Sequence, residues 1–255
     1  MKLYLHGTER KNLNNILKEG IATKYGKATL TDNPKYTISY SSKKTWGTTK
    51  KINDYLDNIK GGMIVVIKSR NIKVAEDSNL IYDNKNKIIS GWPNRYKTEQ
   101  FGFFPKKKTE LVTIKPSSIV AIFGFNKLFI DFLNKLFQEI IGGKIDEKKI
   151  KKYVKMLLKI LSNKKLQLIK PKISIEKIAD SMVNGMIRNL ILREIRQSYL
   201  SMMKLNDWKI INHGGHPVKL KNKKEIAETK KNLLKIIDEE FIEKDVKKEF
   251  KEVFG

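Results

Sequence analysis

The period of the hydrophobic pattern changes near residue 127. Before that point, apolar residues alternate with polar ones or form short β-branched runs, as in residues 3–6, 62–68, 111–114 and 118–125. Such patterns are typical of strands. After residue 127, apolar residues recur every three to four positions, which is typical of helices. The pattern predicts an α+β domain over residues 1–127, followed by an all-α helical domain over residues 128–255.

Two short helices are expected within the first part. Residues 9–20 place Leu13, Ile16 and Leu17 on one face, and Gly20 stands where helices commonly end. Residues 34–42 begin with Pro34, which the first turn of a helix tolerates. Residues 77–108 have no clear period and are predicted to form a long polar loop, and loops of that length are often functional.

The second part is expected to consist of several helices. Residues 127–141 end at Gly142-Gly143, and the longest helix is expected over residues 174–205. Residues 148–161 carry an apolar face opposite Lys151, Lys152, Lys155 and Lys159. Such a helix could lie on a membrane, but within a helical domain we expect its apolar face to be core. A last helical region of alternating charge is expected over residues 223–254.

Composition narrows the class of protein. Hydrophobic residues make up 40% of the chain and charged residues 31%, as in soluble globular proteins. Since cysteine is absent, disulfides, thiolate catalysis and cysteine-based zinc sites are excluded. No apolar run approaches the roughly 20 residues that span a bilayer, and the first residues have no signal-peptide pattern. A cytoplasmic or otherwise intracellular location is expected, including that of a viral protein or one delivered into a host cell.

The strongest global feature is a formal net charge of +26. Residues 1–127 contain 24 basic and 10 acidic residues, and residues 128–255 contain 29 and 17, so both parts are strongly positive. Such a field attracts polyanions, of which nucleic acid is the most common in cells. The alternative is a solvated surface whose lysines reflect a biased amino-acid composition.

Three histidines are candidates for chemistry. His213 and His216 have a metal-like spacing, but the two glycines between them form a flexible turn, and we expect no metal site there. His6 is expected at the end of a strand, where Gly7-Thr8 lets the chain turn. A glycine at this position allows a ligand to approach the backbone closely.

Three short motifs follow one another in an order that resembles the ADP-ribosyltransferase superfamily, in its diphtheria-toxin-like and poly(ADP-ribose)-polymerase-like, His-Tyr-Glu-type branch. His6-Gly7-Thr8 precedes a helix ending in "ILKEG", the segment "TLTDNPKYTISY" follows, and Glu110 leads the strand of residues 111–114. The resemblance covers about residues 3–125. It implies a split β-sheet fold that binds NAD as a substrate, with no metal.

The resemblance also implies a role for each motif. The backbone of Gly7 would hold the nicotinamide carboxamide, and Tyr40 would stack on the nicotinamide ring. His6 would bind a ribose hydroxyl of the adenosine half. Glu110 would accept a hydrogen bond from the nicotinamide-ribose 2′-hydroxyl and stabilise the cation formed as nicotinamide leaves. Catalysis is thus assigned to Glu110, His6 and Tyr40.

The remaining members of the NAD site are Thr8, Thr29 and Tyr36. Thr29 stands where this branch usually has a tyrosine, so the missing wall of the nicotinamide slot would come from another ring: Tyr36, Tyr25 or Trp46. Glu99 is the alternative to Glu110.

The predicted loop of residues 77–108 supplies a candidate acceptor site. Trp92, Arg95, Tyr96 and Phe103 lie there among basic residues, an arrangement that can stack on splayed bases or can anchor a long loop to the core. The expected function is mono-ADP-ribosylation of DNA, RNA or a nucleic-acid-associated protein, as in a toxin or a factor of phage–host conflict. The alternatives are an NAD glycohydrolase or transferase to a small molecule, and a non-catalytic nucleic-acid-binding protein. No membrane partner is expected.

Overall fold

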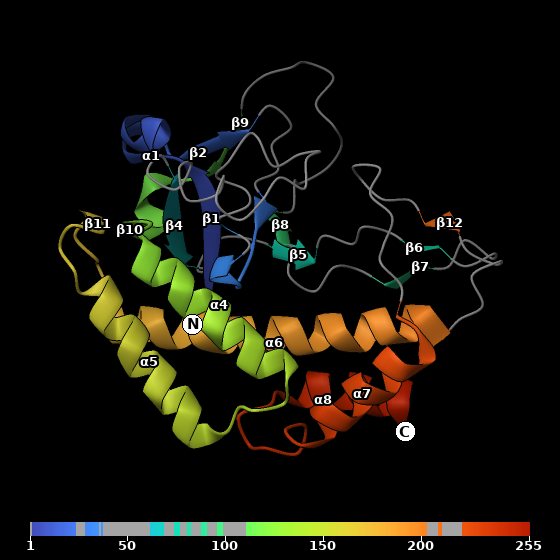
Figure 1. Ribbon diagram of the computed structural model, residues 1–255. Coiled ribbons are helices and arrows are strands. Elements are labelled where there is room, and N and C mark those ends of the chain that lie inside the picture. Colours follow the sequence, from blue (N-terminus) through green and yellow to red (C-terminus); the bar gives the residue numbers. More distant parts are fainter. Residues whose placement is uncertain are drawn as a thin grey trace.

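The structure is a computed structural model. It describes residues 2–23, 29–35, 37, 62–68, 74–76, 81–82, 88–90, 96–98, 111–202, 209–210 and 221–255. Helices and mostly antiparallel strands are mixed along the chain, so the fold class is α+β, as predicted (Figure 1).

A four-stranded antiparallel sheet forms the centre of the strand layer. Its order is β1 (Leu3–Glu9), β4 (Gly62–Lys68), β10 (Ile119–Gly124) and β11 (Gln167–Ile169). The first three strands lie where the apolar pattern predicts them. The last one belongs to the part of the chain that was expected to be all helical. That expectation also fails at β12 (Lys209–Ile210), because strands of two or three residues are too short to give a period.

Smaller sheets surround the central one. Strand β2 (Ile21–Thr23) pairs with β9 (Leu111–Ile114). In a second small sheet, β8 (Tyr96–Thr98) pairs with β3 (Thr29–Leu30) on one side and with β5 (Val74–Glu76) on the other. A third small sheet joins β12, β6 (Ile81–Tyr82) and β7 (Ile88–Ser90). The segment predicted as a continuous polar loop over residues 77–108 therefore contains three short strands.

The two faces of the central sheet bury different cores. Leu3 and Leu5 of β1 point to the face that packs against α4 (Lys127–Ile141), α5 (Glu147–Leu161) and α6 (Ile175–Met202). Tyr4, between them, points to the opposite face, where Ile16 of α1 (Leu13–Glu19) covers the sheet. This alternation follows from the period of two along a strand. Leu17, expected beside Ile16, is instead 43% exposed.

One hydrophobic core continues from the central sheet through the helices to Phe254. Helix α6 lies at its centre and contacts α4, α5, α7 (Lys223–Leu234) and α8 (Lys244–Phe254). In Figure 1 it crosses the molecule between the strands and the last two helices. Residue 127 does not interrupt this core, and the division at that residue into two domains stays a prediction.

Capping side chains explain where the helices begin. The Asn126 Oδ1 atom accepts from the Phe129 amide at 2.8 Å, and Asp146 does the same for Lys149 at 2.7 Å. Asn222 and Glu225 form a reciprocal capping box at the start of α7. These contacts satisfy amides that the first helical turn leaves without partners. Gly142 ends α4 and α6 is the longest helix, both as predicted.

Candidate active site at the edge of the central sheet

The His-Gly-Thr motif lies inside β1. His6, Gly7 and Thr8 are opposite Val65, Ile64 and Met63 of β4, and the pairing continues to Glu9. The predicted turn at Gly7-Thr8 is therefore wrong, because β4 extends far enough to keep the chain in the sheet. A 3₁₀ turn, Arg10–Asn12, then leads into α1, and the Asn12 side chain donates to the Thr8 hydroxyl at 2.9 Å.

Position 7 requires a glycine because the backbone of Thr37 lies too close to leave room for a side chain. A Cβ atom at this position would lie 2.2 Å from the carbonyl oxygen of Thr37, well inside contact distance. Pro34, Lys35 and Thr37 are helical, so the second motif begins its helix against the glycine of the first. On this face of β1 it is the chain itself, rather than a ligand, that approaches Gly7.

The outer edge of β1 offers backbone polar groups beside this contact. On the side away from β4, Leu5 exchanges two hydrogen bonds with Thr31, of 2.7 and 2.9 Å. Every second residue of an antiparallel strand directs its N–H and C=O groups to the same edge, so those of Gly7 point outward as well. A donor and an acceptor directed to one edge are suited to hold a planar amide group.

The turn that follows β3 is built from polar side chains. The Thr31 hydroxyl accepts from the Asn33 amide at 3.0 Å, and the Asn33 Oδ1 atom accepts from the Lys35 amide at 3.0 Å. The Thr37 hydroxyl donates to the Pro34 carbonyl at 2.6 Å. Asn33 is fully buried, and within the described part of the chain the NH2 group of its side-chain amide, Nδ2, has no acceptor. These bonds determine how the helix of the second motif begins.

Helix α6 holds this turn against β1. The Asn189 Nδ2 atom donates to Asp32 Oδ1 at 2.9 Å, and both residues are buried. Gly185, one turn earlier, lets the backbone of Asp32 approach so closely that a Cβ would lie 2.4 Å from its carbonyl oxygen. The second half of the chain thus positions the second motif. This contact was not predicted from the sequence, although a glycine inside a long helix was a signal.

Arg188 extends the connection to the end of the chain. Its guanidinium lies 3.9 Å from the Asp32 carboxylate and pairs with Glu243 at 3.0 Å and Asp245 at 2.7 Å. Burial tends to raise the pKa of Asp245, but the hydrogen bond and positive charge of Arg188 bring it below its ordinary value. Burial, aided by the negative charge of Asp32, raises the pKa of the Tyr4 hydroxyl on β1.

Removing the buried amide of Asn189 should destabilise the protein. We expect Asn189→Ala to lower the free energy of unfolding by about 1–3 kcal/mol, since it removes a buried hydrogen bond to the Asp32 carboxylate. Asn184→Ala, on the same helix, is the matched control, because the Asn184–Asp180 bond is exposed. Its effect should stay below about 1 kcal/mol. Urea unfolding measures both, and equal losses would contradict the assignment.

The strand of the third motif, β9, is held in place by contacts with the end of α1 and with β2. Gly20 ends α1 with φ of 87°, and a Cβ there would lie 2.1 Å from the Ile114 carbonyl oxygen. Strand β9 pairs with β2, with Leu111 opposite Thr23. Glu110 directly precedes Leu111 in the sequence, so this strand pair ends next to the predicted catalytic residue in the chain.

The structure brings together the backbones of Gly7 and Thr37. Thr29 lies in β3 opposite Lys97, and Tyr96 lies in β8 opposite Leu30. The other predicted residues lie outside the described residues: Tyr25, Tyr36, Tyr40, Trp46, Trp92, Arg95, Glu99, Phe103, Glu110, His213 and His216.

Within the described ranges, no three histidine, aspartate or glutamate side chains are grouped so that they could hold a metal. None of the helices described here is both long and apolar enough to cross a membrane.

Comparisons with protein-family models, curated proteins and solved structures found no match.

Proposed function

We propose that this protein is a mono-ADP-ribosyltransferase that cleaves NAD and transfers ADP-ribose to a nucleic acid or a nucleic-acid-associated protein. The observation that carries the proposal is the contact of Gly7 with the Thr37 backbone. It joins two motifs that are thirty residues apart in the sequence, in the order that an NAD site of this family uses. The separation of the strands into small sheets around β1 is compatible with a split-sheet fold of the ADP-ribosyltransferase type.

The outward N–H and C=O groups of Gly7 are the natural partners of the nicotinamide carboxamide. A carboxamide presents one donor and one acceptor in a plane, which matches the pair that a strand edge offers. His6 would bind a ribose hydroxyl, and Tyr40, three residues after Thr37 on the same predicted helix, would stack on the nicotinamide ring. Thr8, Thr29 and Tyr36 complete the proposed site.

The reaction requires a carboxylate near the nicotinamide ribose. The bond between the ribose C1′ atom and the nicotinamide nitrogen breaks, and its electron pair leaves with nicotinamide. An acceptor oxygen or nitrogen then forms a new bond to C1′ and loses its proton to solvent. The role of Glu110 is to bind the ribose 2′-hydroxyl and stabilise the positive charge on the ribose, an electrostatic contribution that is often the largest in catalysis.

The proposed acceptor follows from charge. With a net charge of +26 spread over both halves, the protein attracts polyanions rather than neutral or cationic substrates. The basic and aromatic residues Trp92, Arg95, Tyr96 and Phe103 are the proposed acceptor contacts, since bases stack on such side chains.

A panel of acceptors tests the proposal. The full chain is incubated with NAD labelled in the adenosine half, together with single-stranded DNA, duplex DNA, RNA or cell protein. Nicotinamide release and labelling of one acceptor are expected. Release with label only in free ADP-ribose would favour an NAD glycohydrolase. No release in any arm would overturn the enzymatic proposal and leave a nucleic-acid-binding protein.

A further inference from the structure

Helix α5 has one buried face and one lysine face. Ile150, Tyr153, Leu157 and Ile160 are buried in the core that α5 shares with the sheet and α6. The apolar stripe of this helix is therefore core, as expected, and it is not available to a membrane. The opposite side is a surface hollow lined by Glu147, Lys148, Lys151, Lys152, Lys155, Met156 and Lys159.

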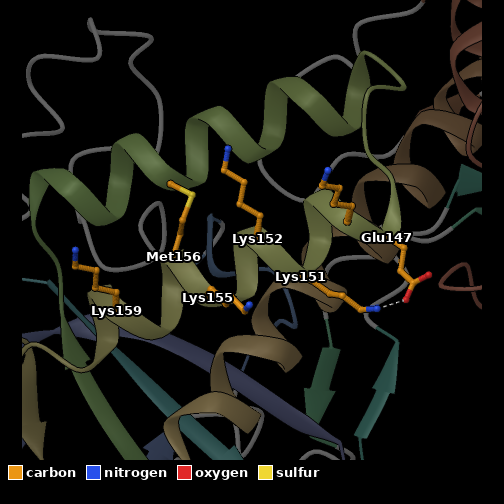
Figure 2. A pocket seen from close by; sticks show the side chains of 7 residues that line it. Glu147, Lys151, Lys152, Lys155, Met156 and Lys159 are labelled. Carbon is orange, nitrogen blue, oxygen red and sulfur yellow. Dashed lines mark ion pairs between the residues drawn. The ribbon is translucent and has the colours of Figure 1, made fainter.

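Four of these lysines form a single row, which we call the α5 lysine row: Lys148, Lys152, Lys155 and Lys159. Their spacing of four, three and four residues keeps them on one stripe of an α-helix. The row extends over about 16 Å at 1.5 Å per residue. All four are exposed, and among the described residues none of them has an ion-pair partner. Figure 2 shows Lys152, Lys155 and Lys159 extending from the helix.

Glu147 is the acidic residue among those that line the hollow. From residue 148 to residue 174 the chain has ten lysines and no acidic residue. The ion pair of Lys151 with Glu147 lies at the start of the helix, and Lys149 is turned away from the row toward Glu139, at 3.7 Å. Lys164, Lys165, Lys170 and Lys172 continue the exposed positive surface along the turn and strand that follow α5.

We propose that the α5 lysine row binds the phosphodiester backbone of nucleic acid, independently of sequence. Lysine acts as a point charge for phosphate, and a row without aromatic or amide side chains can hold the backbone but cannot read bases. A bilayer is a poorer match, because in this hollow Met156 is the apolar side chain and it is only 36% exposed. None of the lysines in the row belongs to the proposed NAD site, so nucleic-acid binding at the row does not depend on the proposed catalysis.

Neutralising the row tests the inference. The variant carries glutamine at all four positions of the row, which keeps helix propensity and leaves the buried face intact. The matched control carries glutamine in place of four exposed lysines of α7 and α8: Lys223, Lys224, Lys244 and Lys251. Both variants lose the same charge, so they separate a local contact from the overall field of the protein. Circular dichroism and melting temperature confirm that both are folded.

Binding is measured by fluorescence anisotropy over a series of salt concentrations. The probes are a DNA duplex of two helical turns, its single strand and the matching RNA. At about 0.1 M salt, affinity should fall by at least about 30-fold in the row variant and by less than about 5-fold in the control. The slope of log K against log salt for the duplex should become less negative by about 3 to 4, since each lost phosphate contact contributes about 0.9.

Three results would overturn the inference. Equal losses in the two variants would mean that only net charge matters. Unchanged binding by the row variant would place the contact elsewhere. Binding of the native chain to vesicles with anionic phosphatidylserine, but to none of the nucleic acids, would make the row a lipid-binding surface. None of these outcomes depends on NAD turnover.

Discussion

Replacing Glu110 with glutamine is expected to lower the rate of NAD cleavage by at least about 100-fold. The substitution keeps the size of the side chain and one hydrogen-bond-accepting oxygen, but it removes the negative charge that would stabilise the developing cation. NAD binding should change little, because the charge matters most in the transition state. Nicotinamide release measures the rate, and calorimetric titration with NAD measures the binding.

Glu99→Gln is the matched control for this prediction. It removes the same charge from the alternative carboxylate, and we expect it to retain most of the activity. If Glu99→Gln abolishes cleavage while Glu110→Gln retains it, the catalytic assignment moves to Glu99. If both variants are fully active, the carboxylate mechanism is wrong.

Gly7→Ala should damage both folding and activity. The added methyl would lie 2.2 Å from the Thr37 carbonyl oxygen, and the surrounding atoms belong to the backbone, so the start of the second motif must move. We expect a loss of about 1–3 kcal/mol in the free energy of unfolding, which is typical of overpacking. For a chain of this size that corresponds to a fall of about 3–10 °C in melting temperature. NAD cleavage should fall further than stability explains, because Tyr40 belongs to the same motif and the same predicted helix as Thr37.

Gly124→Ala supplies the comparison within the same sheet. A Cβ at Gly124 would lie 3.7 Å from its nearest neighbour, the Arg10 guanidinium, which is ordinary contact distance. This variant should melt within about 2 °C of the native protein and retain its activity. A Gly7→Ala protein that is as stable and active as Gly124→Ala would contradict the close contact on which the site is built.

Long periodic segments were predictable from the sequence. The helices α4 and α5 lie close to their expected bounds, because amphipathic stripes, capping side chains and the Gly142-Gly143 stop all agree, and α6 begins one residue after its expected start. The strands β4 and β10 were predictable for a similar reason, since their β-branched runs are buried on both faces.

Features that depend on tertiary contacts were not predictable. Strands of two or three residues, such as β6 and β11, exist because a partner strand pairs with them, and they have no period of their own. The close contact at Gly7 was not predicted for the same reason: its need for space comes from Thr37, which only the fold places beside it. The contact of Asn189 with Asp32 spans 157 residues and leaves no local pattern.

The two halves of the chain therefore depend on each other at the candidate site. The first half supplies the edge of the sheet, and α6 from the second half holds the turn that begins the second motif. In our proposal, α5 adds a surface for the acceptor backbone. Our proposals thus give the helical half two roles: positioning the proposed NAD site and binding nucleic acid.

The most direct measurement of the central claim is the intact mass of the acceptor nucleic acid after incubation with the protein and NAD. The proposed function predicts a discrete product that is heavier by one ADP-ribosyl group, formed together with an equal amount of free nicotinamide. Nucleic acid and cell protein of unchanged mass, with NAD left intact, would contradict it.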